Sequence, residues 1–302
     1  MSAEENSSTP PEPREPSEPA PYTSETPHGG FESGLPVPES MRMQPPSKWF
    51  PPENFNVPWG WLDVAMLVPI AMALIFIFAL IIIGSEVAFF HARPGYLRAH
   101  MNFLLILAQI VMELALLGFL ALQVRTRIHR PFWPTIGWRP LRSQTMSRAG
   151  TYFGFICGGI GLALLVSLAS AAFPPKQPLP IEKIFESRSL TILFMATAVL
   201  VAPLVEETIF RGYLYPVAAR SFGVVGGVVF TGAVFGLLHG SQLWGGWWQI
   251  GLLVCVGILF TFARASTRTN VSSFLLHVSY NSVQVIAVLV SLYAPKDILH
   301  MH

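Results

Sequence analysis

A few ionisable and amide side chains stand inside the long apolar segments of this sequence, where such groups are costly. They occur in "VEETIFRGYLYP" (205–216), at the end of "FTGAVFGLLH" (230–239) and in "HVSYN" (277–281). The side chains are Glu206, Glu207, Arg211, His239, His277 and Asn281. By default, ionisable residues in such segments mark a transport pathway, a proton relay or a reaction site. A carboxylate, two imidazoles and an amide together suit hydrolysis, in which a base takes a proton from water and hydrogen-bond donors hold the oxyanion.

Helical spacing separates the two adjacent glutamates. Residues four apart share a helix face, so Glu207 is predicted to pair with Arg211. Glu206 points about 100° away from Glu207 and has no base nearby in the sequence. We therefore interpret the Glu207–Arg211 pair as a helix-stabilising ion pair and Glu206 as the free carboxyl. A protonated Glu206, hydrogen-bonded to a neighbouring helix, is the alternative.

The same spacing rule applies to the other two motifs. Phe235 lies one turn before His239, and Asn281 lies one turn after His277. Each also has a purely structural interpretation. Phe235 is expected to serve in packing. Taken by itself, His239 is interpreted as a residue at the membrane interface. His277 and Asn281 can simply join helices by hydrogen bonds.

The amino-acid composition indicates the environment in which these motifs lie. The chain is 52% hydrophobic and 12% charged, against roughly 25% charged residues in ordinary soluble domains. This predicts an all-α, polytopic membrane helical bundle. Segments long enough to cross a bilayer, which takes about 20 helical residues, predict about seven spans, with six or eight as alternatives. They are 62–84, 101–124, 150–172, 188–219, 222–240, 246–263 and 271–293.

The motifs project to similar depths in these spans. Measured from the predicted inner ends of their spans at ~1.5 Å per residue, the depths are ~21 Å for Glu206, ~26 Å for His239, ~14 Å for His277 and ~20 Å for Asn281. Three helices thus bring polar groups to one layer, as a buried site requires. An unbroken helix over 188–219 would be ~48 Å long, so we expect it to tilt or to break at Pro203.

Charge distribution predicts the topology and the domain organisation. The 125–149 linker carries six arginines and no acid, which is typical of a cytoplasmic loop and places the N-terminus in the cytoplasm. Residues 1–40 carry eight glutamates, and 13 of the 26 prolines precede residue 53. We therefore predict a disordered, acidic, Pro-rich cytoplasmic tail over 1–55 and a transmembrane helical domain over 56–302.

The three motifs resemble those of a known family. "EETIFR" matches its E-E-x-x-x-R pattern, "FGLLH" its F-x-x-x-H and "HVSYN" its H-x-x-x-N, in the same order. The chain is similar to the CAAX-protease and bacteriocin-processing (CPBP, or Abi) intramembrane proteases, including the type II CAAX-prenyl endopeptidases, over a protease-like core at about 188–293. The resemblance implies that Glu206 is the general base and His239 assists it. It further implies that His277 and Asn281 stabilise the oxyanion.

The resemblance leaves the use of a metal open. The resemblance implies that Glu207 and Arg211 support the structure of the site. Members of the family are often labelled metalloproteases, and Glu206, His239 and His277 are a ligand set that zinc accepts. The H-E-x-x-H motif is absent, and a metal-bound Glu206 would leave only the paired Glu207 as base. We therefore favour a reaction that requires no cofactor, with Zn²⁺ as the alternative.

The leading hypothesis is an intramembrane endopeptidase acting on a peptide or membrane-protein substrate. We expect a multi-pass protein of a prokaryotic plasma membrane, in contact with the lipid bilayer and with no nucleic-acid partner. Two alternatives remain. One is a non-catalytic scaffold or bacteriocin-immunity-type binding protein of the same fold. The other is a transporter or proton relay through Glu113, Glu206 and the histidines, although the spans show no inverted repeat.

Overall fold

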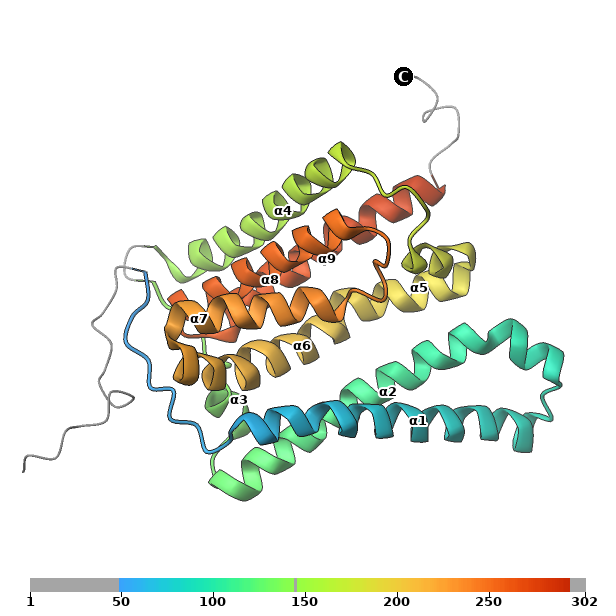
Figure 1. Ribbon diagram of the computed structural model, residues 1–302, viewed down its shortest axis with the longest axis horizontal. Coiled ribbons are helices and arrows are strands. Elements are labelled where there is room, and N and C mark those ends of the chain that lie inside the picture. The colour runs from blue at the N-terminus through green and yellow to red at the C-terminus, as the bar shows by residue number, and fades with distance from the viewer. Residues whose placement is uncertain (1–48, 144–145, 294–302) are drawn as a thin grey trace, which may run out of the picture. The chain divides into compact units, whose positions relative to one another are not determined.

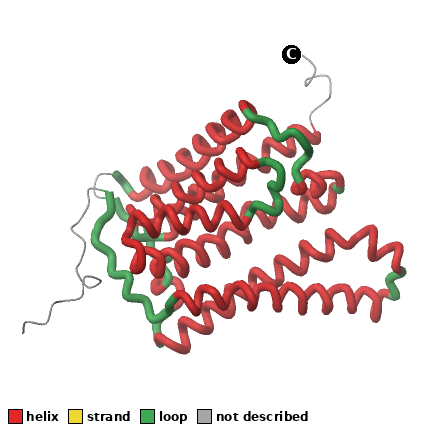
Figure 2. Tube along the Cα trace, viewed as in Figure 1, coloured by secondary structure: helices red, strands yellow, loops and turns green. Residues whose placement is uncertain are grey.

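The computed structural model describes residues 49–143 and 146–293, which all belong to one compact unit, Met43–His302. Every regular element in these ranges is helical, so the predicted all-α fold is confirmed (Figures 1 and 2). The prediction of a disordered tail falls mainly on residues 1–48, which lie outside the described residues.

The α-helices follow one another along the chain with short connections. They are α1 (Trp61–Phe90), α2 (Pro94–Ile128), α3 (Phe132–Thr135), α4 (Arg148–Ala172), α5 (Arg188–Ala196), α6 (Ala202–Glu206), α7 (Tyr215–Leu238), α8 (Trp247–Thr267) and α9 (Asn270–Tyr293). A 3₁₀ helix, Pro180–Glu186, precedes α5, and π-helical segments, Thr197–Val201 and Glu207–Leu214, flank α6.

Six helices in the described ranges are long and apolar enough to cross a membrane, so the chain is a multi-pass integral membrane protein. One of them covers Arg188 to Leu238, where the sequence predicts a fourth and a fifth span. At 51 residues it would be ~76 Å long if straight, far more than the ~30 Å of hydrocarbon. This helix must therefore fold back on itself to stay in the bilayer.

The reversal occurs at Gly223. Its backbone (φ 73°, ψ 170°) is not helical and is a conformation that glycine adopts without strain. Beyond the turn, a Cβ on Gly227 would lie 2.7 Å from the backbone of Ala219, so the returning arm packs closely against the incoming one. The fourth and fifth predicted spans are therefore two helical arms joined directly at Gly223, so the six apolar helical stretches include both of them.

The expected break at Pro203 takes another form. Pro203 lies in the first turn of α6, and the chain stays helical through it. Proline lacks an N–H and crowds the carbonyl four residues earlier, and the helix widens to π geometry both before and after α6. Such π segments are frequent at functional sites. Here they set the direction in which residues 206–211 present their side chains.

Small residues bring the site helices together. A Cβ added to Gly232 or Gly236 of α7 would come within 2.6 Å of the α8 backbone, so these glycines allow α7 and α8 to cross closely, as small residues four apart often do in membranes. A Cβ added to Gly159 of α4 would lie 2.4 Å from the carbonyl oxygen of Leu276 in α9. These contacts fix α7 and α9, the helices that carry His239 and His277.

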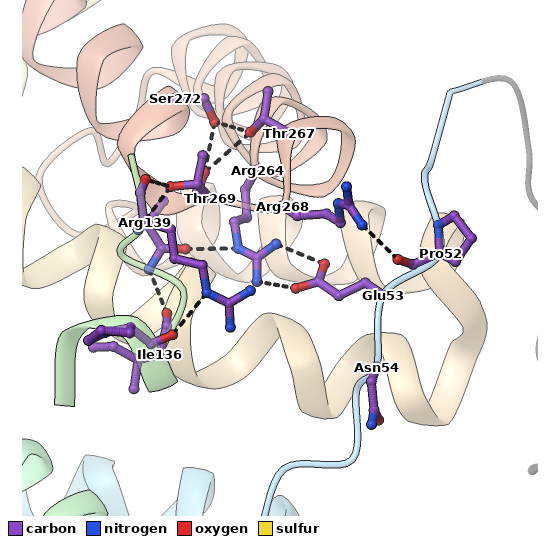
Figure 3. A network of polar contacts seen from close by, with 12 residues as sticks. Pro52, Glu53, Asn54, Ile136, Arg139, Arg264, Thr267, Arg268, Thr269 and Ser272 are labelled. Atoms are coloured by element: carbon purple, nitrogen blue, oxygen red, sulfur yellow. Dashed lines mark hydrogen bonds and ion pairs between the residues drawn. The ribbon is translucent and has the colours of Figure 1, made fainter. Parts of the chain in front are cut away.

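Residues 49–60, which we call the strap, precede α1 and pack against α7 and α8 (Figure 3). Glu53 accepts two hydrogen bonds from the buried guanidinium of Arg264, at 2.8 and 2.9 Å. Arg268 donates to the carbonyl of Pro52 at 3.2 Å, and the ring of Phe55 meets that of Tyr215 edge to face. Packed structure therefore begins at residue 49 at the latest, earlier than the boundary predicted at residue 55.

The turn between α8 and α9 is held by Asn270. Its side chain accepts a hydrogen bond from Arg264 at 2.8 Å and donates to the carbonyl of Ile136 at 2.9 Å. Its backbone N–H donates to the carbonyl of Gly137 at 2.9 Å. Because α9 starts at Asn270, these bonds fix the depth at which its site residues lie.

Candidate active site

The polar residues of the three sequence motifs converge on one place. Glu206 ends α6, His239 follows the last residue of α7, and His277 and Asn281 lie in α9. Together with Phe235 they line a cavity of about 240 Å³. The structure therefore brings together the four side chains that the sequence proposes as catalytic.

Glu206 lies between the two histidines. Its carboxyl oxygens are 3.9 Å from Nε2 of His239 and 3.7 Å from Nε2 of His277. These distances exceed those of ordinary hydrogen bonds, and a contact of this length is one that a water molecule can bridge. About a quarter of the Glu206 side chain, 23%, remains exposed, so the carboxyl faces the cavity.

The other ring nitrogen of each histidine is already hydrogen-bonded. Nδ1 of His239 lies 2.8 Å from the carbonyl oxygen of Phe235, which can only accept, so this nitrogen must carry the proton. Nδ1 of His277 lies 2.9 Å from Glu207, whose carboxylate also accepts from Arg211. In its neutral form each imidazole then turns an unprotonated Nε2 toward Glu206.

In this arrangement, hydrogen-bond acceptors of Glu206, His239 and His277 face one another. An ionised Glu206 and two neutral imidazoles present only lone pairs to the space between them. That space is therefore suited to a group that brings protons or positive charge, of which a water molecule is the simplest. A water held there would lie beside a carboxylate able to take one of its protons.

The predicted Glu207–Arg211 ion pair is present, with 3.1 Å between Nη1 and Oε1 and both side chains fully buried. Arg211 also donates to the hydroxyl of Thr261 and to the carbonyl of Gly257. The charge is thus paired and hydrogen-bonded, as a buried charge must be. The sequence did not indicate that Glu207 also bonds His277, because that contact joins residues far apart in the chain.

Phe235 is the aromatic centre of the site. Its ring contacts those of His239 and His277, with centroids 4.9 and 5.7 Å apart. The guanidinium carbon of Arg211 lies 4.4 Å from its centroid, in cation–π range. The packing role expected for Phe235 is consistent with these contacts, which place both histidines against one buried ring.

Asn281 is hydrogen-bonded to the π-helical segment Thr197–Val201. Its side-chain nitrogen donates to the carbonyl of Ala198 at 2.8 Å. The amide has a second N–H, and Asn281 lines the cavity. One N–H thus orients the side chain, and the other is the donor that an oxyanion can use.

Other residues that line the cavity belong to none of the three sequence motifs. Gln109 of α2, Gln242 after α7 and Gln284 of α9 add neutral amides to the cavity wall. Gln109 also donates to Glu113 at 2.9 Å. The i, i+4 spacing of Gln109 and Glu113 was visible in the sequence, but nothing there placed them beside the cavity.

A structural or catalytic zinc ion needs at least three protein ligands. Within residues 49–143 and 146–293, no group of three or more His, Cys, Asp or Glu side chains is arranged to hold a metal ion. The donor types of Glu206, His239 and His277 suit zinc, and their Nδ1 bonds resemble those that orient metal-bound histidines. Their spacing in this arrangement does not form a closed site, so the steps derived below use only the side chains and water.

A family model described as "Type II CAAX prenyl endopeptidase Rce1-like" matches residues 188–283. The matched segment runs from the start of α5 into α9 and contains every residue of the three motifs. No curated protein and no solved structure matches the chain. Over residues 188–283, this match supports the resemblance to type II CAAX prenyl endopeptidases that the three sequence motifs indicate.

Proposed function

We propose that this protein is an intramembrane endopeptidase that hydrolyses a peptide bond in a membrane-embedded or peptide substrate. The observation that supports this best is the position of Glu206 between the Nε2 atoms of two histidines, beside a cavity. The membrane protease family of residues 188–283 supports the same reaction class. The cavity wall also includes residues outside the matched segment, namely Ile106, Gln109, Ile181, Phe185, Gln284, Val285 and Val288.

In the proposed mechanism, a water between the three side chains attacks the scissile carbonyl. Glu206 takes one water proton as general base, and His239 Nε2 accepts the second hydrogen bond and orients the water. The carbonyl oxygen becomes an oxyanion, which the free N–H of Asn281 stabilises. Glu206 then returns the proton to the leaving amine as the carbon–nitrogen bond breaks, which completes the hydrolysis.

In this mechanism, His277 acts when both of its ring nitrogens are protonated. Its Nδ1 proton remains on the bond to Glu207, and the proton on Nε2 then becomes a second donor for the oxyanion. The carboxylate of Glu207, 2.9 Å away, balances the positive charge of that form. Glu207 is thus proposed to orient His277 in addition to neutralising Arg211.

The proposal includes the membrane setting. We place the N-terminus in the cytoplasm of a prokaryote. The tail predicted over 1–55 is shortened to the residues before the strap, the transmembrane domain follows it, and 188–293 is the protease core. The arginine-rich 125–149 linker supports this orientation. The partners are the lipid bilayer and a peptide or membrane-protein substrate.

The experiment compares membrane-peptide profiles of cells that carry the wild type, Glu206→Gln or Glu86→Gln. Glu86 lies in α1 and outside the cavity wall, so its variant is a matched control for the loss of one carboxylate. A substrate should accumulate uncut with Glu206→Gln alone. Identical profiles in all three strains would argue for a non-catalytic binding protein.

A further inference from the structure

The candidate cavity reaches one end of the helices only. Its wall includes Ile181 and Phe185 of the 3₁₀ helix and Gln242 of the α7–α8 loop. The backbone N–H of Ile181 donates to the carbonyl of Gln242 at 3.1 Å, which joins these two segments at the mouth. None of the described lining residues belongs to the α2–α4 connection, the Gly223 turn or the α8–α9 turn, which form the opposite end.

Arginines mark that opposite end. Figure 3 shows Arg139, Arg264 and Arg268 gathered there with the strap. The arginines in the loops and helix termini of this end are Arg125, Arg127, Arg130, Arg139, Arg142, Arg148, Arg220, Arg264 and Arg268. The loops, short helix and helix termini at the mouth end carry fewer cations, namely Arg93, Arg98, Lys176, Lys183 and Arg188. Short loops rich in Lys and Arg stay in the cytoplasm, so the cavity mouth faces the other side of the membrane.

The wall of the cavity has a distinct chemistry. Apart from Glu206 and the two histidines, its side chains are apolar or neutral, including Phe194, Val285 and Val288. Away from Glu206, a charged substrate side chain would lose its hydration without meeting an opposite charge, which is unfavourable. Three glutamine amides, together with Asn281, are neutral groups able to hydrogen-bond the backbone of an extended segment.

We propose that the cavity takes uncharged, apolar polypeptide segments presented from the non-cytoplasmic side of the membrane. Its substrates are then exported or membrane-anchored polypeptides whose cleavage site lies outside the cytoplasm. This inference rests on the proposed protease function and adds to it the side from which the substrate enters. Two arms test it, and the first does not depend on activity.

The first arm measures orientation by thiol labelling. Cys157→Ala and Cys255→Ala remove the native cysteines, and either Lys183→Cys at the mouth or Arg130→Cys at the opposite end is then introduced. Both positions are exposed. A membrane-impermeant thiol reagent should label Lys183→Cys in intact cells and Arg130→Cys only after permeabilisation. The reverse pattern would overturn the proposal, whether or not the protein cleaves anything.

The second arm maps new peptide N-termini in membranes from wild-type, Glu206→Gln and Glu86→Gln cells. Cleavage sites lost with Glu206→Gln and kept with Glu86→Gln should lie in non-cytoplasmic segments, without a charged residue next to the cut bond. Glu206-dependent sites in cytoplasmic segments, or sites flanked by charges, would contradict the proposal. If no site depends on Glu206, the proposed function fails, and the labelling arm still decides which way the cavity faces.

Discussion

Replacing Glu207 by glutamine tests the buried part of the site. The carboxylate accepts hydrogen bonds from Arg211 at 3.1 Å and from His277 at 2.9 Å, and its side chain is fully buried. At an effective dielectric of about 20, two charges 3.1 Å apart attract by ~5 kcal/mol. Breaking a buried pair by removing one partner usually costs about 3–5 kcal/mol, because the other charge stays buried.

Glutamine keeps one carbonyl acceptor, so we expect Glu207→Gln to lower the free energy of unfolding by about 3 kcal/mol, the lower end of that range. This corresponds to a fall of roughly 5–10 °C in the unfolding temperature of the detergent-solubilised protein. Cleavage should also fall, since the amide cannot serve Arg211 and His277 as an ionised carboxylate does. Thermal unfolding and a cleavage assay measure the two effects separately.

The control removes both charges, in a variant with Glu207→Leu and Arg211→Met. Without an unpaired buried charge, this protein should unfold at a higher temperature than Glu207→Gln, while its cleavage stays low because His277 has lost its partner. An unfolding temperature of Glu207→Gln equal to that of the wild type would refute the reasoning. So would a double variant less stable than the single one.

Three further predictions concern the cavity side of the site. Asn281→Ala should keep residual cleavage, with kcat reduced by roughly 10²- to 10³-fold, because one oxyanion donor is lost; unchanged kcat would remove Asn281 from the mechanism. His239→Ala and His277→Ala should each abolish measurable cleavage, and the double variant should be hardly worse than either single one, since groups that act as a unit are not additive. Multiplying losses would indicate that the histidines act independently. Prolonged treatment with a strong chelator should leave cleavage intact, whereas a lasting loss that zinc restores would show that a metal is required.

The depth of the polar residues was the most informative part of the sequence. The helical rise alone placed Glu206, His239 and His277 in one layer, and the structure brings their polar atoms within 4 Å of each other in two pairs. Periodicity also predicted the Glu207–Arg211 pair correctly. Both results depend on spacing within single helices, which is the information that a sequence carries most directly.

Contacts between distant segments could not be predicted in the same way. The bond from His277 to Glu207 depends on how α9 packs against the π-helical segment, and Gln109 reaches the cavity only because α2 lies beside α5 and α6. The strap was predicted to be part of a disordered tail because its prolines suggested it. Glu53 nevertheless finds Arg264, a residue more than 200 positions away, as its partner.

The count of spans shows a similar limit. Hydropathy located the apolar segments, but it could not show that the fourth and fifth follow each other directly, through a reversal at Gly223. Nor could it show that Pro203 is accommodated by π-helical widening on both sides. In each case, one backbone conformation decides the outcome, and hydropathy does not report backbone conformation.

The central claim is that Glu206 activates the attacking water, and the most direct measurement compares kcat of purified wild type and Glu206→Gln on a peptide that the membrane profiles identify. Glutamine keeps the shape of the side chain and loses its basicity, so the account predicts a fall in kcat of about 10²- to 10⁴-fold, the usual contribution of a general base, with an unchanged unfolding temperature. Glu86→Gln should match the wild type in both respects. Wild-type kcat in folded Glu206→Gln would contradict the account.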